Sequence, residues 1–263
     1  MTDSTPLLED TTGVSSVVGA VLMIGVVTLA LSAFAVYALP QITESEDEIQ
    51  GGIAENALEK IQDGVVEVTS GGGDRAEVAL PTGGQTNIQL DVYPDRGRIW
   101  VNSSTTASKE IDGFPLGAVV HDESETAYQF GGVWKRGDSG TGEVVSPLPI
   151  TTTDRESLTI TLPVMLVRGN GGIGQRAEIT VENSQDRYPS LYVPADESVN
   201  ITVKSKHYAP MARNLEERLP AGVVTVSTDP ARETVTVILG ANSEPQDQEL
   251  YLHLSSHTVD IGL

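Results

Sequence analysis

The residues from Val14 to Leu39 form an uninterrupted apolar segment, which restricts the architecture more than any other feature of the chain. The segment has 26 residues, of which 20 are apolar and none is charged. As a helix it would extend about 39 Å, enough to cross a hydrocarbon layer of about 30 Å with some tilt. Residues 1–13 contain three acids and no Lys or Arg, unlike the basic start of a secretory signal. The segment therefore predicts a membrane-inserted helix, and its apolar stretch ends at Pro40, where a helix often ends or bends.

The residues after Pro40 become amphipathic. Acidic residues separate the apolar ones, which return at intervals close to a helical stripe: Ile42, Ile49, Ile53, Ala57, Leu58 and Ile61. This spacing predicts one long helix from Val14 to about Ile61. Its apolar half covers residues 14–40 and its amphipathic half covers residues 41–62.

Short alternating runs of Val, Ile, Thr and Tyr dominate the remainder, residues 63–263, and Gly, Pro, Asp and Asn separate them. This pattern is typical of strands and turns. The predicted strands include Val65–Thr69, Ala76–Leu80, Asn87–Tyr93, Arg98–Val101, Leu158–Arg168, Val199–Ser205, Thr234–Leu239 and Glu249–Ser255. One short helix is predicted at Ala209–Leu219, where Pro210 fits the first turn and Pro220 stops it.

Together these patterns predict an α+β fold, in which a long N-terminal hydrophobic and amphipathic helix precedes a mainly antiparallel, β-sandwich-like domain with one short helix. A stretch rich in Pro and Thr near residues 146–154 would divide two sheet layers or two subdomains.

The charge and the absence of cysteine exclude several classes of protein. There are 16 Lys and Arg against 37 Asp and Glu, a formal net charge of −21, so the phosphates of a nucleic acid are not an expected partner. The chain has no cysteine, which excludes disulfide scaffolds, cysteine-zinc sites and thiol catalysis. An acid excess spread over the whole chain indicates a protein that works in high salt, where charges are strongly screened. The alternative is an ordinary acidic surface protein.

The sequence Thr12-Gly13-Val14-Ser15-Ser16-Val17-Val18-Gly19-Ala20-Val21-Leu22-Met23 resembles the N-terminus of archaeal type IV pilins and archaellin-like pilins. A second stretch, Val203–Arg218, resembles haloarchaeal pilin-like surface proteins. The resemblance implies a leader over residues 1–13, which a membrane prepilin peptidase removes by cutting between Gly13 and Val14. It also implies that the apolar helix is kept and packs with like pilin subunits in a filament.

Three motifs of enzymes occur without the partners that they need. Gly137-Asp138-Ser139-Gly140 spells a serine-protease nucleophile motif, but the only upstream histidine, His121, is 18 residues away. The run Gly169–Gly174 satisfies G-x-G-x-x-G, but a strand rather than a helix is predicted after it. His253 and His257 are four residues apart, a helical spacing, in a run that alternates like a strand. We therefore expect no catalytic residue, cofactor or metal site, and no enzyme activity.

Two N-x-S/T sequons, at Asn102 and Asn200, are candidate glycosylation sites, which are accepted only on an exported surface. The expected function is a non-enzymatic, pilin-like surface subunit of a cell membrane. Its external domain, residues 63–263, would serve adhesion or surface contact. The alternative is a single-span anchored ectodomain that binds a ligand or envelope component without polymerising. A third hypothesis, an anchored hydrolase, lacks a complete catalytic constellation in the sequence.

Overall fold

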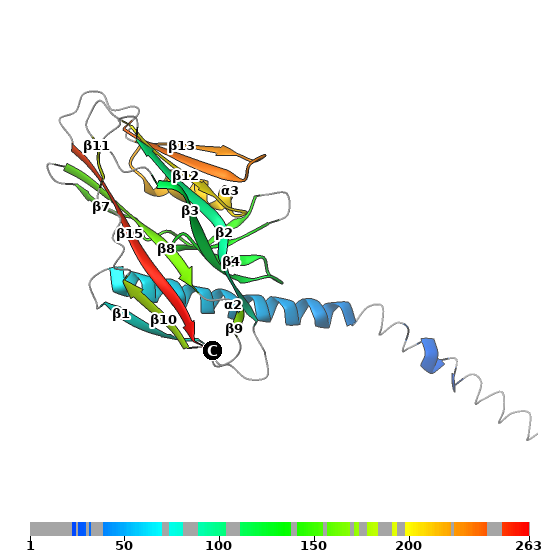
Figure 1. Cartoon of the computed structure of the whole chain (residues 1–263). Coiled ribbons are helices and arrows are strands. Elements are labelled where there is room, and N and C mark those ends of the chain that lie inside the picture. The colour runs from blue at the N-terminus through cyan, green and yellow to red at the C-terminus, as the bar shows by residue number, and fades with distance from the viewer. Residues whose placement is uncertain are drawn as a thin grey trace, which may run out of the picture. The chain divides into compact units, whose positions relative to one another are not determined.

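Figure 1 shows the computed structural model of the chain. It describes residues 23–24, 26–29, 32, 39–69, 74–80, 89–103, 111–137, 141–154, 157–168, 171–173, 178–183, 191–193, 198–221, 224–240 and 249–262. The chain divides into two compact units, Met1–Ile49 and Gln50–Leu263.

The described elements are mainly strands. Helices α2 (Leu39–Thr69) and α3 (Tyr208–Arg218) accompany them, besides the helical residues 23–24, 26–29 and 32. The strands are β1 (Arg75–Ala79), β2 (Leu90–Ser103), β3 (Ile111–His121), β4 (Thr126–Gln129), β5 (Gly132–Lys135), β6 (Glu143–Ser146), β7 (Thr151–Asp154), β8 (Ser157–Arg168), β9 (Gly171–Ile173), β10 (Glu178–Asn183), β11 (Leu191–Val193), β12 (Val199–Lys204), β13 (Val224–Asp229), β14 (Thr234–Leu239) and β15 (Glu249–Gly262).

The strands form two sheets (Figure 1). The nine-stranded sheet has the order β13-β14-β12-β2-β3-β4-β5-β6, with β9 beside β2. The six-stranded sheet has the order β1-β10-β15-β8-β7, with β11 beside β15. Strands β8 and β15 pair in parallel, from Ser157 beside Glu249 to Arg168 beside Asp260, and the other strand pairs described are antiparallel.

In β12 and β14 of the nine-stranded sheet, buried residues alternate with more exposed ones, as their alternating sequences require. In β14, Val235, Val237 and Leu239 are buried, while Thr234, Thr236 and Ile238 alternate with them and are half-buried. Helix α3 covers this inner face through Met211 and Leu215, which belong to the same hydrophobic cluster. Proline at position 210 is accepted in the first turn of α3, where its missing N–H would have no partner within the helix.

Helix α2 supplies the second core. Its buried residues recur at intervals of three and four, as a helix with one buried stripe requires: Ala54, Ala57, Leu58, Ile61, Val65 and Val68. They form one cluster with Val78 of β1 and Val181 of β10 from the six-stranded sheet, and with Leu90 of β2 and Tyr128 of β4 from the nine-stranded sheet. The side-chain amide of Gln62 donates to the carbonyls of Gly131, at 3.0 Å, and Pro147, at 2.6 Å. Packing and hydrogen bonds therefore fix α2 against both sheets.

In the unit Met1–Ile49, the described residues 23–24, 26–29 and 32 are helical. Five large apolar side chains here are exposed, Met23 (73%), Ile24 (66%), Val26 (64%), Val27 (53%) and Leu29 (73%). Among the residues that the structure describes, no helix combines the length and apolarity that crossing a membrane requires. Most of the segment Val14–Leu39 lies outside the described residues.

The predicted α+β fold class is wrong. Strands dominate the described chain, and its described residues contain no long apolar helix. Helix α2 is described from Leu39 onward, so Pro40 lies within a described helix. Among the residues of α2 whose side chains the structure describes, the buried stripe runs from Ala54 to Val68, and Ile49, assigned to the stripe from the sequence, is 58% exposed.

The predicted strand Val65–Thr69 is also wrong, because these residues form the last turns of α2. The run has the β-branched residues of a strand, but Val65 and Val68 continue the spacing of Ile61 and are buried with it. Tertiary packing here outweighs the local preference. The sandwich prediction did not include the parallel β8–β15 pair, which joins segments about ninety residues apart.

Two glycines of α2 provide a test of this packing. A Cβ on Gly64 would lie 2.6 Å from the Cγ2 of Val78, whereas one on Gly52 would meet no atom within 4 Å. Gly64→Ala should lower the free energy of unfolding by roughly 1 kcal/mol. Overpacking costs about 1–3 kcal/mol, and the higher helix propensity of Ala offsets about 1 kcal/mol of that cost.

Gly52→Ala is the matched control in the same helix, and it should raise the free energy of unfolding by about 1 kcal/mol. Urea unfolding of the full chain in detergent measures both. An increase for Gly64→Ala equal to that for Gly52→Ala would show that α2 does not pack closely on β1.

Candidate binding face

The outer face of β2, β12, β14 and β13 gathers polar side chains around one tryptophan. We call it the Trp100 face, and its residues are Arg98, Trp100, Asn102, Asn200, Thr202, Lys204, Thr234, Thr236 and Ser227. Strand pairing aligns them in rows: Trp100 lies opposite Thr202, which lies opposite Thr236, and Arg98 lies opposite Lys204, which lies opposite Thr234. The residues between them, such as Ile99 and Val203, are buried in the core. Alternation along the strands therefore selects which side chains reach this face.

Trp100 is half-buried and has one edge against β3. A Cβ on Gly113 would lie 3.1 Å from the indole Nε1 of Trp100, so the absence of a side chain at Gly113 makes room for the ring. Gly113 has a φ of +63°, a conformation that favours glycine. The other tryptophan, Trp134, is fully buried and donates from Nε1 to the carbonyl of Gln129 at 2.8 Å.

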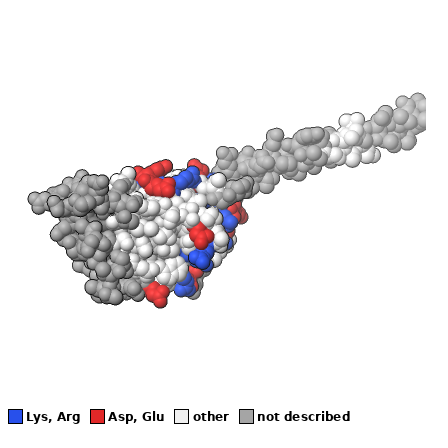
Figure 2. Space-filling model, turned by 90° about the horizontal axis from the view of Figure 1, so that it is seen from above, with Lys and Arg blue, Asp and Glu red and all other residues white. Residues whose placement is uncertain are grey.

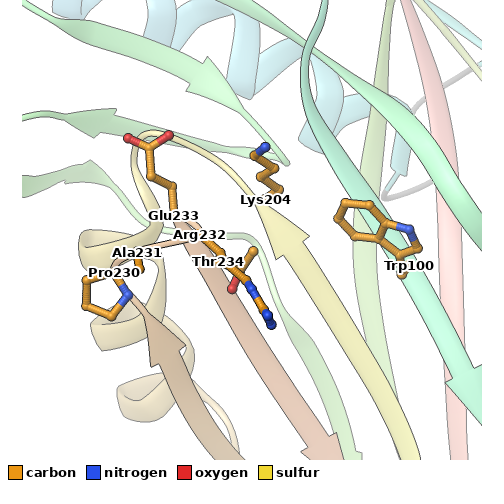
Figure 3. Close-up of a pocket in the computed structure, with 7 residues that line it drawn as sticks. All are labelled: Trp100, Lys204, Pro230, Ala231, Arg232, Glu233 and Thr234. Atoms are coloured by element: carbon orange, nitrogen blue, oxygen red, sulfur yellow. The ribbon is translucent and has the colours of Figure 1, made fainter.

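A pocket of about 580 Å³ opens between Trp100 and the turn that joins β13 to β14. Figure 3 shows Lys204 between the indole ring and the turn, where Arg232 and Glu233 lie with Pro230. The pocket thus combines an aromatic wall with cationic, anionic and hydroxyl groups.

The two predicted glycosylation residues meet on this face. Asn102 of β2 lies directly opposite Asn200 of β12 in the antiparallel register, and both are exposed. They are about a hundred residues apart in the chain, and nothing in the sequence indicated that they are neighbours. The structure places Asn102 two residues from Trp100 on the same strand and the same face.

The predicted cleavage residues Gly13 and Val14 lie outside the described residues, as does Ser139 of the protease-like motif. In the glycine-rich run, Gly171–Ile173 forms β9, and the next described element is the strand β10. His253 and His257 lie on the strand β15, as their alternating sequence predicted.

One local network has the residue types of a catalytic triad but a different geometry. His121 Nδ1 lies 2.7 Å from Ser124 Oγ, and its Nε2 lies 3.9 Å from a carboxylate oxygen of Glu123. His121 is the last residue of β3, and Glu123 and Ser124 follow it in the turn to β4; the Ser124 hydroxyl also contacts Thr126 Oγ1 at 2.9 Å. Burial lowers the pKa of His121, and nearby carboxylates oppose this effect. These contacts close the turn.

Metal binding has no support in the described part of the chain, where no group of three or more His, Asp and Glu side chains is placed to hold an ion. The absence of a cofactor, a metal and an enzyme activity stays a prediction.

Sequence reasoning missed Trp100, Lys204 and the turn at residues 229–234. The signal for Trp100 was present in the alternating run Arg98–Val101, where the two aliphatic residues point inward and the tryptophan therefore points to the polar side. The pocket itself depends on strand order, which brings residues about 130 positions apart in the chain together.

Charged side chains of both signs lie on the described surface. Figure 2 shows Lys and Arg interspersed with Asp and Glu on the visible face, with uncharged residues between them. Several are paired, including Arg96 with Asp122 at 3.2 Å and Lys135 with Glu55 at 2.7 Å. The excess of acid in the chain therefore does not form one continuous acidic surface on this described face.

A buried polar cluster lies next to β12. Ser205 Oγ donates to Gln129 Oε1 at 2.6 Å and accepts from the backbone N–H of His207 at 2.9 Å. Burial lowers the pKa of His207 to about 4, assisted by the charges of Arg96, Arg136 and Lys206. Among the described residues, His207 Nδ1 has no hydrogen-bond partner.

His207 should therefore make stability depend on pH. An unfolded histidine gains its proton near pH 6.5, while folded His207 stays neutral down to about pH 4, so stability falls as pH decreases from about 6.5 to 4. The expected loss is roughly 3 kcal/mol across this window. His207→Gln should remove it, and the difference between the two proteins isolates His207 because carboxylates titrate in both. Parallel stability curves in urea unfolding from pH 7 to pH 4 would contradict the assignment.

Comparison with known proteins identifies a family whose function is unknown. No curated protein and no solved structure shows significant similarity to the chain. One family model matches residues 12–261, which cover most of the chain. The chain belongs to the family of unknown function DUF7289.

Proposed function

We propose that this protein is a non-enzymatic, pilin-like cell-surface subunit. The apolar segment Val14–Leu39 holds it at the cell membrane and packs with the same segment of other copies. The β-rich unit faces outward and makes adhesive or surface contacts. A prepilin peptidase and like subunits are the expected partners.

The observation that carries the proposal is the exposed apolar surface of residues 23–29. Burying one large apolar side chain contributes about 1.5–3 kcal/mol, so leaving five in water is unfavourable and a covering is expected. Lipid or identical segments supply such a covering.

The hydroxyl groups within the same segment are compatible with apolar surroundings. Thr28 Oγ1 donates to the carbonyl of Ile24, and Ser32 Oγ donates to the carbonyl of Thr28, both at 2.8 Å. Each hydroxyl therefore has a partner four residues back and leaves no donor that needs water. The sequence adds small residues, Gly19, Gly25 and Ala33, which let another helix approach closely.

The N-terminal sequence of protein purified from its native cells tests the pilin assignment. If a prepilin peptidase processes the chain, the mature protein begins at Val14 and lacks residues 1–13. A surface form that keeps residues 1–13 would refute the assignment and favour the anchored ectodomain that binds without polymerising.

Assembly is tested by a charge placed in the apolar segment. Val26 is 64% exposed, and Val26→Asp should remove most of the protein from sedimented filaments or membranes, since an aspartate in apolar surroundings costs several kcal/mol. Ile49→Asp is the matched control, because Ile49 is 58% exposed and lies outside the apolar segment. Equal sedimentation of the two variants would contradict assembly through residues 14–39.

A further inference from the structure

The pocket beside Trp100 has the features of a ligand site. Its volume of about 580 Å³ lies within the range common for small-molecule sites. Seven residues from three parts of the chain line it: Trp100, Lys204, Pro230, Ala231, Arg232, Glu233 and Thr234 (Figure 3).

The wall opposite Trp100 is held in place by its own hydrogen bonds. Asp229 Oδ1 accepts from the backbone N–H groups of Ala231, at 3.0 Å, and Arg232, at 3.3 Å. Glu233 has a φ of +54°, and its carbonyl accepts from the N–H of Ser205 at 2.9 Å. The turn is therefore preorganised, which lowers the entropy cost of binding a ligand.

Cationic groups outnumber anionic ones in the pocket, although the whole chain carries a net charge of −21. Lys204 is exposed, and no carboxylate among the described residues lies within salt-bridge distance of its ammonium group. Arg232 forms an ion pair with Asp229, in which the Nε of Arg232 lies 3.6 Å from the Oδ2 of Asp229. An anionic group on a ligand thus has Lys204 as a free partner.

The surface beside the pocket carries neutral hydrogen-bonding groups. Thr202 and Thr236 hydroxyls lie 3.1 Å apart, and Asn200 is exposed two residues from Thr202. Hydroxyl and amide groups both donate and accept, as the hydroxyl groups of a sugar do. An aromatic wall beside such groups suits a sugar ring, whose C–H groups pack on an indole face while its hydroxyl groups hydrogen-bond around it.

We propose that the pocket beside Trp100 binds an acidic saccharide, a uronic-acid sugar. The sugar ring packs on Trp100, its carboxylate pairs with Lys204, and its hydroxyl groups bind the Thr234 hydroxyl and the neighbouring threonines. This inference deepens the surface-contact part of the proposed function and rests on it only for the exposure of this face outside the cell.

Two other ligand classes fit the pocket less well. Addition of an extended peptide as a new strand needs an unpaired strand edge, but Trp100 and Lys204 lie on β2 and β12, which are interior strands with a paired neighbour on each side. A nucleic acid needs several cations along its phosphates, and the pocket offers two.

The saccharide has two sources, which share this chemistry. One is a glycan attached to Asn102 or Asn200 of the chain itself. Side chains directly opposite on antiparallel strands are about 5 Å apart at Cβ, so the pair has room for only one glycan. The first sugar of that glycan would lie beside Trp100. The other source is a polysaccharide outside the chain.

Titration of the full chain in detergent tests the proposal, with protein made in a host that adds no N-glycan. The probes are tetragalacturonate, neutral maltotetraose and tetraglutamate at one ionic strength. We expect tetragalacturonate to bind at least tenfold more tightly than either of the other probes. Equal binding of maltotetraose would overturn the role of the carboxylate, and equal binding of tetraglutamate would overturn the saccharide.

Variants assign the contacts. Lys204→Gln should weaken tetragalacturonate binding at least fivefold, and Trp100→Ala at least tenfold. Trp100→Phe keeps a ring and should lose less than Trp100→Ala. Lys206→Gln removes the same charge from an exposed lysine outside the pocket and should change affinity less than twofold. If Trp100→Ala fails to fold, the comparison of Lys204→Gln with Lys206→Gln tests the site alone. Equal affinities of these two variants for tetragalacturonate would overturn the site.

Protein from native cells distinguishes the sources. If the chain's own glycan fills the pocket, native protein binds no added tetragalacturonate, and the double variant Asn102→Gln, Asn200→Gln regains binding. If the saccharide comes from outside, native protein binds as well as the unglycosylated chain. Absence of binding by the unglycosylated chain overturns the inference. Because binding is measured on purified chains, this result is independent of whether the mature protein begins at Val14 or forms filaments.

Discussion

Burial of the apolar stripe of α2 is the interaction on which the β-rich unit depends. Six residues from Ala54 to Val68 are buried, and they contact strands of both sheets. Removing this stripe would expose Val78 and Val181 on one sheet and Leu90 and Tyr128 on the other. Gln62 adds directional contacts to this packing, because its side-chain amide donates to the carbonyls of Gly131 and Pro147. The helix thus acts as part of the core and connects the sheets.

Alternation of buried and outward-facing residues along the strands explains where the Trp100 face arises. Inward residues such as Ile99, Ile201 and Val237 pack beneath the sheet in the cluster that includes α3. Once these side chains are committed to the core, the alternation of the strands forces Trp100, Thr202 and Thr236 to the other side. An aromatic ring on a polar face is the unusual outcome, since the remaining neighbours in its row are Thr202, Thr236 and Ser227. The pocket is therefore a consequence of the alternation together with the β13–β14 turn.

Local patterns predicted strands such as β14, because Val235, Val237 and Leu239 repeat with the period of a half-buried strand, but they did not predict β3. Helix α3 was also predicted within one residue at each end, since Pro210 and Pro220 mark its limits. The failures have physical causes that are not local. The residues Val65 and Val68 have strand propensity, and only the sheets packed against them keep them helical. Likewise, the pairing of Asn102 with Asn200 and the pocket at Lys204 depend on strand order, which the sequence of a single chain does not encode in any short pattern.

The two proposed activities of the chain differ in how they depend on salt. Packing of apolar segments such as residues 23–29 is not screened by ions, and excluded salts strengthen it. The pairing of Lys204 with a carboxylate lies on an exposed face, where screening is strong because the Debye length falls to about 3 Å at 1 M salt. If the protein works in high salt, as the acid excess predicts, the indole of Trp100 must therefore supply most of the affinity and Lys204 mainly the selectivity for an anionic sugar. Assembly through the apolar segment and recognition through an aromatic ring are the two interactions that such an environment weakens least.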